Sequence, residues 1–159
     1  MAILEAQLEK IKSFCAYQER SHREVRSKLL EMEVYGADLE QAMVVLIEEN
    51  YLNEERFARA LVGGKFRMKQ WGRLKIRQAL KQHQVSEYCI RKGMEEIDDD
   101  VYEATFNRLA EQKWQSLRGE RNRFIRMAKL RNYLMGKGYE PELFYAFLRK
   151  QGEEPSSEH

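Results

Sequence analysis

Apolar residues along this chain recur at intervals of three and four positions, the spacing that places them on one face of an α-helix. The clearest sets are Leu39, Ala42, Met43, Leu46 and Ile47; Ile76, Ala79 and Leu80; and Phe106, Leu109, Ala110 and Trp114. No run of alternating apolar and polar residues is long enough to predict a strand. Only two of the 159 residues are proline, which favours long helices. The pattern therefore predicts an all-α protein.

Residues that favour helix ends divide the chain into about nine predicted helices. Ser21 and Glu24 have the spacing of a capping box, in which each side chain accepts a hydrogen bond from the other residue's backbone N–H. A second box is predicted from Asp38 to Gln41. Further helix starts are predicted after Asn53, Ser86 and Asp98 and at Pro141. Gly36 and Gly138 stand where a left-handed residue is expected to follow a helix.

The predicted helices fall into a repeat. An Arg-x-x-Leu pair occurs three times, at Arg26 and Leu29, Arg77 and Leu80, and Arg131 and Leu134, with offsets of 51 and 54 residues. A nearly constant period predicts tandem units, each too small to bury its apolar face alone. We expect an elongated array of three three-helix, helix-turn-helix-like modules at residues 3–50, 53–97 and 99–150. Residues 151–159 have the composition of a disordered tail.

The net charge is only +2, but the charges are unevenly distributed. Residues 57–86 contain eight basic residues and no acid, with Phe66 and Trp71 among them. A second basic stretch covers residues 113–137, where Glu120 is the only acid. Such stretches attract polyanions or an acidic protein surface. The alternative is a solvated helical face whose counter-charges lie on a neighbouring helix, and the sequence leaves both interpretations open.

Candidate chemistry for catalysis or metal binding is absent from the sequence. Gly63-Gly64-Lys65 lacks the first glycine and the following Ser/Thr of a phosphate-binding loop. The set Cys15, His22, His83 and Cys89 has no closely spaced pair of the kind that zinc sites use. Two distant cysteines, no apolar run of membrane-spanning length and no basic leader predict a protein of the reducing cytoplasm. We expect no enzyme activity, no metal and no cofactor, with Trp114 as a core anchor.

Three motifs resemble those of a known family. The first is Ser21-x-x-Glu24-x-x-x-x-Leu29, and the second is the run from Tyr51 to Ala58, Tyr-Leu-Asn-Glu-Glu-Arg-Phe-Ala. The third is Arg67-x-Lys69-x-Trp71-Gly72-Arg73-x-Lys75-Ile76. Together they resemble the bacterial RecX family of recombination regulators. Glu54 replaces the family's usual aspartate, and Arg73 replaces a frequent proline. The third predicted module is similar to the family by pattern more than by motif.

The resemblance implies a non-catalytic modulator of RecA, built from three-helix repeats, that binds in the groove of the RecA–DNA filament. It implies inhibition of recombinase, ATPase and coprotease activity, and so regulation of DNA repair and the SOS response. We expect a cytoplasmic monomer whose binding to DNA, directly or through RecA, is weak and salt-sensitive. The residues predicted to contact the filament or its DNA are Arg67, Lys69, Trp71, Arg73, Lys75, Arg77 and Lys81, assisted by Arg121, Arg123 and Arg126.

An alternative remains open on the same residues. Three-helix modules with a basic second helix also suit a freestanding DNA-binding protein of the helix-turn-helix type. Gln78 and Gln82 lie on the same predicted helix as Arg77 and have side chains that read base edges. Specific binding that survives moderate salt in the absence of RecA would favour this alternative.

Overall fold

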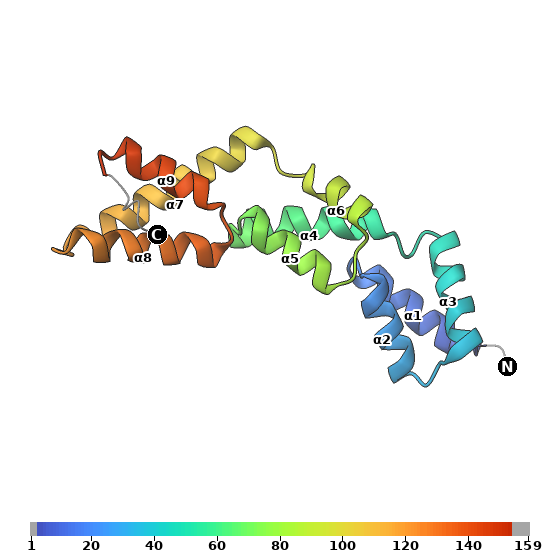
Figure 1. The fold of residues 1–159 in the computed structure, drawn as a ribbon. Coiled ribbons are helices and arrows are strands. Elements are labelled where there is room, and N and C mark those ends of the chain that lie inside the picture. The colour runs from blue at the N-terminus through green and yellow to red at the C-terminus, as the bar shows by residue number, and fades with distance from the viewer. Residues whose placement is uncertain (1–2, 154–159) are drawn as a thin grey trace. The chain divides into compact units, whose positions relative to one another are not determined.

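The computed structural model describes residues 3–153, which form nine helices and no strand (Figure 1). The helices are α1 Glu5–Tyr17, α2 His22–Glu31, α3 Gly36–Glu48, α4 Glu54–Lys69, α5 Arg73–Gln82, α6 Glu87–Met94, α7 Asp99–Ser116, α8 Arg123–Lys137 and α9 Pro141–Lys150. The all-α prediction is confirmed. Among the described residues, no helix is both long and apolar enough to cross a membrane. Most of the predicted disordered tail, residues 154–159, lies outside the described part of the chain.

The chain divides into two compact units. Unit 1 consists of Met1–Val62 and Ala79–Glu96, and unit 2 of Gly63–Gln78 and Ile97–His159. The division passes through α4 and α5, so each of these helices belongs partly to both units. The units therefore do not coincide with the three predicted modules, whose limits stay a prediction.

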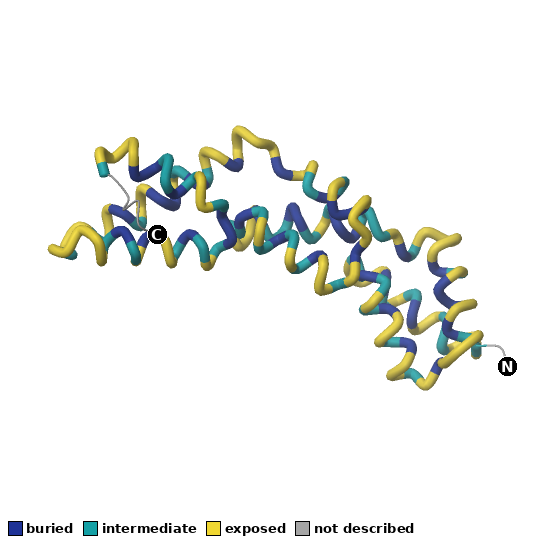
Figure 2. Tube along the Cα trace, viewed as in Figure 1, coloured by how far each residue is buried: buried dark blue, intermediate teal, exposed yellow. Residues whose placement is uncertain are grey.

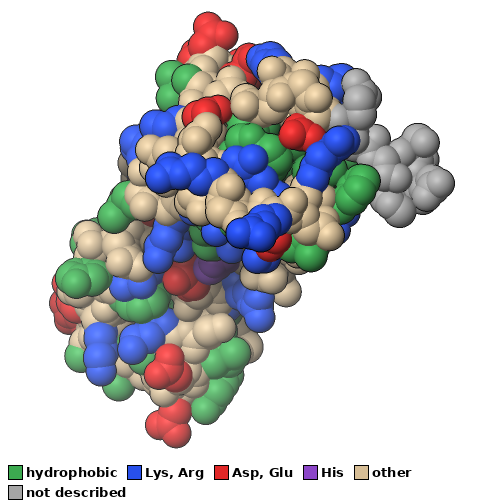
Figure 3. Space-filling view, turned by 90° about the vertical axis from the view of Figure 1, so that its left-hand side faces the viewer, with side chains coloured by type: hydrophobic (Ala, Val, Ile, Leu, Met, Phe, Trp, Pro, Cys, Tyr) green, Lys and Arg blue, Asp and Glu red, His purple; other side chains and the backbone are tan. Residues whose placement is uncertain are grey.

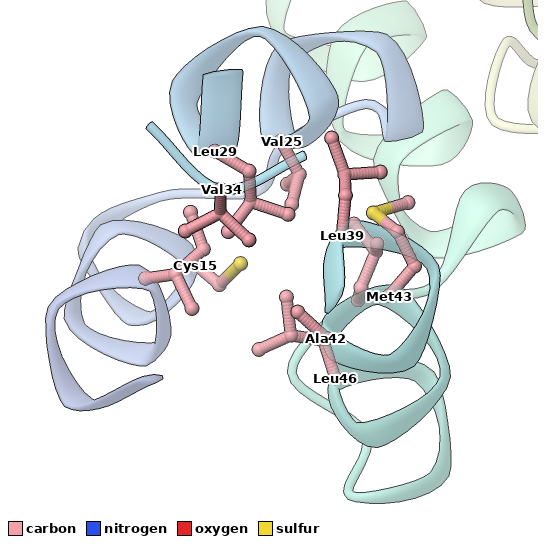
Figure 4. Close-up of a cluster of buried hydrophobic side chains, with 10 residues drawn as sticks. Cys15, Val25, Leu29, Val34, Leu39, Ala42, Met43 and Leu46 are labelled. Atoms are coloured by element: carbon pink, nitrogen blue, oxygen red, sulfur yellow. The ribbon is translucent and has the colours of Figure 1, made fainter. Parts of the chain in front are cut away.

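In unit 1, α1, α2 and α3 enclose a cluster of aliphatic side chains (Figure 4). Val25 and Leu29 of α2 meet Ala42 and Leu46 of α3, and all four are completely buried. Burial of a leucine side chain stabilises a fold by roughly 1.5–3 kcal/mol. The three- and four-residue spacing therefore fixes which face of each helix turns inward, and Figure 2 shows the resulting change between buried and exposed positions along the helices.

Most of the predicted helix starts are confirmed. The Ser21 hydroxyl accepts from the Glu24 N–H at 3.0 Å, and the Glu24 carboxylate accepts from the Ser21 N–H at 2.9 Å. Side-chain oxygens of Asn53, Ser86 and Asp98 likewise accept from the N–H three residues later. Pro141 is the first residue of α9, as predicted.

The second predicted capping box is wrong. α3 begins at Gly36, its N-cap is Tyr35, and no side chain caps it. Gly36 has the expected left-handed backbone, with φ of +54°, but it is the first residue of α3. The left-handed residue that follows α2 is Glu33, with φ of +62°. Because the helix begins three residues earlier than predicted, with Tyr35 and not Asp38 as its N-cap, Asp38 lies in the first turn, where its negative charge interacts favourably with the helix dipole. Gly138, in contrast, ends α8 with φ of +95°, as predicted.

Unit 2 has an aromatic core. Tyr139, which follows α8, is completely buried, and its ring centroid lies 5.3 Å from those of Tyr102 and Phe106 on α7. Phe66, at the end of α4, continues the cluster with its centroid 5.9 Å from that of Tyr102. Aromatic pairs at these separations add stability beyond the area they bury. The core thus joins the last part of α4 to α7 and to the turn between α8 and α9.

Candidate functional site

The two units carry opposite net charges. Unit 1 contains 11 Lys and Arg against 15 Asp and Glu, which gives −4. Unit 2 contains 17 Lys and Arg against 11 Asp and Glu, which gives +6. Figure 3 shows Lys and Arg side chains in several groups across one face, with Asp and Glu side chains between them. A site for a polyanion is therefore to be sought in unit 2.

A close backbone junction in unit 2 positions the basic residues. The Gly72 N–H donates to the Lys137 carbonyl at 2.6 Å, and the Leu74 N–H donates to the Gly138 carbonyl at 3.0 Å. The first N–H groups of α5 and the last carbonyls of α8 have no partners within their own helices. Each helix end therefore satisfies the other, and the end of α8 is held against the start of α5.

Two glycines permit this approach. A Cβ atom on Gly72 would lie 2.5 Å from the backbone nitrogen of Tyr139, which is closer than real Cβ contacts allow. A Cβ on Gly138 would lie 2.7 Å from the backbone nitrogen of Lys75, and the positive φ of Gly138 disfavours a side chain in any case. The Tyr139 hydroxyl completes the junction by donating to the Gln70 carbonyl at 2.9 Å.

Lysines and one half-buried tryptophan gather around the junction. The Lys65 and Lys75 ammonium nitrogens lie 4.8 Å and 4.5 Å from the centre of the Trp71 ring. Lys75 also donates to the Gly136 carbonyl at 3.2 Å, and Lys137 donates to the Lys69 carbonyl at 3.1 Å. These donors complement the negative ends of the α8 and α4 dipoles. Each lysine is thus held in place by a tertiary contact.

A second aromatic ring extends this arrangement along α8. Lys113 and Lys137 place their ammonium nitrogens 5.0 Å and 5.8 Å from the centre of the Tyr133 ring. We refer to Lys65, Trp71, Lys75, Lys113, Tyr133 and Lys137 as the lysine–aromatic strip. None of its four lysines forms an ion pair with any residue from 3 to 153. Burial, and then the nearby Lys75 charge, lower the pKa of Lys137. The strip therefore holds uncompensated positive charge, which a bound anion would relieve.

Arg73, one of the predicted contact residues, is paired with acidic residues of unit 2. Its guanidinium forms ion pairs with Asp99 and Glu140 and lies 4.0 Å from the centre of the Tyr102 ring. Its backbone N–H donates to the Tyr102 hydroxyl at 3.0 Å, and that hydroxyl donates to Glu140. Burial and the Glu140 carboxylate hold the pKa of Tyr102 far above its usual range. For Arg73, then, the counter-charges do lie on neighbouring elements, as the alternative interpretation of the basic stretch supposes.

Two predicted residues of the third module are also engaged. Arg126 lies 3.6 Å from the centre of the buried Trp114 ring and donates to the Trp114 carbonyl at 2.6 Å. This contact places Trp114 in the core, as expected. Arg123 forms an ion pair with Glu153 at 2.9 Å. Both arginines have partners within unit 2.

The remaining predicted cations have no ion pair with a residue in the described range 3–153. Arg67, Lys69 and Arg121 are exposed, and Arg77 is half-buried. Lys81 is exposed but belongs to unit 1, so it is not part of the site in unit 2. These residues, except Lys81, add to the positive charge of unit 2.

The sequence did not single out Lys65, Lys113, Tyr133 and Lys137 as site residues. The four-residue spacing of Tyr133 with Lys137 is a detectable pattern, since both residues lie in α8 and such pairs lie together on a helix face. Trp71 precedes the start of α5, so its contact with Lys75 is not a pair on a helix face. The approach of Lys113 to Tyr133 depends on the packing of α7 against α8 and has no counterpart in local spacing.

Unit 1 contains a surface groove beside α2. The groove has a volume of about 360 Å³ and is lined by Phe14, Arg23, Glu24, Ser27, Lys28, Glu31 and His83. Its charges are mixed, so it does not resemble an anion site. No group of three or more potential metal ligands occurs within residues 3–153. Burial raises the pKa of Cys15 to about 11 and also raises that of Cys89, which disfavours the reactive thiolate.

Comparisons with known proteins identify two domains of one family in this chain. The model of the second three-helix domain of RecX matches residues 53–94, and that of the third matches residues 100–148. The regulatory protein RecX of Clostridium perfringens strain 13 is 30% identical over 82% of this chain, and that of Clostridium tetani is 31% identical over 82%. The chain spans only 61% and 60% of the length of these relatives.

Solved structures show the same fold. The crystal structure of RecX from Lactobacillus salivarius matches 94% of this chain and 99% of its own, with a TM-score of 0.78 and 16% identity. A second crystal structure, of a regulatory protein RecX, matches 91% of this chain and 73% of its own, with a TM-score of 0.77 and 21% identity. With two domain models of one family covering more than half of its length, this chain belongs to the RecX family.

Proposed function

We propose that this protein is a non-catalytic modulator of RecA that binds in the groove of the RecA–DNA filament. Bound there, it inhibits the recombinase, ATPase and coprotease activities and so regulates DNA repair and the SOS response. Membership of the RecX family and the lysine–aromatic strip of unit 2 support this proposal. The three-module organisation, with limits at residues 3–50, 53–97 and 99–150, and a cytoplasmic location are part of it.

The strip is the observation that carries the proposal. Its four lysines are held by aromatic rings and backbone carbonyls, and none is neutralised by a carboxylate from the described part of the chain. Side chains held in place lose little conformational entropy on binding, so they suit a regularly spaced row of phosphates. The backbone of DNA inside a filament presents such a regularly spaced row of phosphates. Each lysine that contacts a phosphate adds to the salt dependence of binding.

The ATPase activity of RecA on single-stranded DNA tests the proposal when the protein is titrated in. A Lys65→Glu/Lys113→Glu variant reverses two charges of the strip and removes no backbone hydrogen bond. A Lys10→Glu/Arg91→Glu variant is the matched control, because it makes the same charge change at exposed positions of unit 1. We expect the strip variant to need at least about tenfold more protein for half-inhibition, on the scale of two lost charged contacts.

The possible outcomes test separately whether RecA is the partner and whether the lysine–aromatic strip is the contact surface. An unmodified protein that leaves the ATPase activity unchanged at a few micromolar contradicts the RecA proposal as a whole. Inhibition that the strip variant retains in full shows instead that the strip is not the contact. Sequence-specific binding to DNA without RecA, measured in moderate salt, would support the freestanding DNA-binding alternative.

A further inference from the structure

The outer face of α3 in unit 1 exposes apolar side chains among carboxylates. Val44 and Ile47 are 51% and 46% exposed, and Glu40 and Glu48 lie one turn before and one turn after Val44 on the same side of the helix. Leu30 on α2 is 50% exposed and follows Arg26 by one turn, and the Arg26 guanidinium reaches across to Glu40. These residues form one surface, which we call the acidic–apolar face.

The charge on this face restricts its partner. Its one cation, Arg26, is already paired with Glu40, so the Glu48 carboxylate leaves the surface negative. Carboxylates repel the phosphates of nucleic acids and of anionic membranes. Exposed aliphatic residues rimmed by charge are typical of protein contact sites. The partner that fits is therefore a protein surface that is both apolar and basic.

Unit 2 has such a surface at the start of α8. Phe124 and Ile125 are 62% and 44% exposed. Arg118 and Arg121, in the preceding turn, are exposed and form no ion pair with a residue from 3 to 153. The nearby acid, Glu120, is occupied by Lys129 and by the Asn122 N–H. We call Arg118, Arg121, Phe124 and Ile125 the basic–apolar end.

We propose that the acidic–apolar face of one copy of this chain binds the basic–apolar end of a second copy. The two surfaces match in both respects, with apolar residues at the centre and opposite charges around them, and they lie in units of net charge −4 and +6. Because two different surfaces meet, the contact is head-to-tail, and a dimer leaves one surface of each kind free to bind a further copy.

The association is weak and salt-sensitive. Few apolar side chains are involved, and attraction between exposed charges is screened at high ionic strength. The protein is therefore monomeric when dilute and associates as its concentration rises. The inference does not rest on the proposed function, since the contact requires neither RecA nor DNA.

Two double variants each block one of the surfaces without destabilising the helix that carries it. Val44→Lys/Ile47→Lys blocks the acidic–apolar face, and lysine favours a helix at least as well as the residues it replaces. Phe124→Glu/Ile125→Glu blocks the basic–apolar end, at the second and third positions of α8, where negative charge is favourable. Tyr88→Lys and Met68→Glu are controls, since they replace exposed apolar residues outside both surfaces, one in each unit.

Sedimentation equilibrium from about 1 to about 200 µM measures the association over the range expected of weak contacts. At low salt, the average mass of the unmodified protein and of both controls rises with concentration, and raised salt abolishes the rise. Each double variant alone stays monomeric. An equimolar mixture of the two forms a one-to-one dimer and nothing larger, because each variant retains the surface that the other lacks.

Several results would overturn the proposal. One is an unmodified protein that stays monomeric over the whole range at low salt. Another is a double variant that still associates by itself, since a symmetric contact would then be present. A mixture that stays monomeric contradicts the pairing of these two surfaces, and controls that lose association show that the contact lies elsewhere.

Discussion

Gly72 and Gly138 bring the start of α5 and the end of α8 into direct backbone contact, with the Gly72 N–H and the Gly138 carbonyl each bonded to the opposite helix. This contact fixes the position of Lys75 relative to Lys137. The Lys75 ammonium group donates to the Gly136 carbonyl, and the Lys137 ammonium group donates to the Lys69 carbonyl. The arrangement of charge in the strip therefore depends on two residues that carry no side chain.

A side chain at Gly72 is expected to destabilise unit 2. In Gly72→Ala the new methyl group meets the backbone of Gly138 and Tyr139, which must move, at a cost of about 2–3 kcal/mol in the free energy of unfolding. Gly64→Ala is the control, because a Cβ there meets nothing within 4 Å inside α4, and it should stabilise by about 0.5–1 kcal/mol. Urea unfolding measures both. Equal effects of the two substitutions would contradict the junction.

Arg126 and Arg121 are expected to behave differently although both were predicted contacts. Arg126→Ala removes the guanidinium from the Trp114 ring and carbonyl, which should lower the free energy of unfolding by about 1–2 kcal/mol. Arg121→Ala should leave stability unchanged and weaken inhibition of RecA, because Arg121 is exposed. Thermal unfolding, together with ATPase inhibition by the folded protein, checks the pair. An Arg126→Ala protein of unchanged stability would argue for a contact role instead.

Binding of a polyanion is expected to raise the pKa of Lys137. In the free protein, burial and Lys75 lower that pKa below the usual 10.5. A phosphate beside the strip favours the charged form, so binding takes up a proton and the affinity falls as pH rises toward 10.5. Titration of the Lys137 side-chain carbon resonances by NMR, with and without single-stranded DNA, measures the change. A pKa that DNA leaves unaltered would place the phosphates elsewhere.

Acid is expected to weaken unit 1 through Glu54. Burial of this carboxyl raises its pKa, but interactions with neighbouring residues together lower the pKa below its usual value. The largest of these is the hydrogen bond from the Ser86 hydroxyl at 2.7 Å, and the Cys89 side chain and the Ser86 N–H at 3.3 Å add to it. With a lowered pKa in the folded state, the stabilisation is present at neutral pH and is lost as pH falls below about 4. Glu54→Gln should make the free energy of unfolding less dependent on pH in this range. Unfolding curves between pH 3 and pH 7 give the comparison, with exposed Glu87→Gln as the control.

Local features of the fold were predictable, and contacts between distant segments were not. The Ser21 capping box and the left-handed Gly138 follow from neighbouring residues alone. The box at Asp38 failed because Gly36 starts α3 earlier through a backbone conformation that no residue type reveals with certainty.

In the candidate site, too, local features were predictable and contacts between distant segments were not. A run of cations in the sequence predicts positive potential, but the sequence does not reveal that Asp99 and Glu140 neutralise Arg73 or that Trp114 engages Arg126. These partners lie 12 or more residues away and meet only after the helices pack. Tyr133 with Lys137, one helical turn apart in α8, is the part of the strip that local spacing indicates.

The opposite charges of the two units have a practical consequence. A chain with a pI of about 8.5 is ordinarily expected to bind only cation-exchange resin at neutral pH. Here a unit of −4 and a unit of +6 each offer a patch to a resin of opposite sign. The protein should therefore be retained on both kinds of column in low salt, and the salt needed to elute it from each reports on one unit at a time.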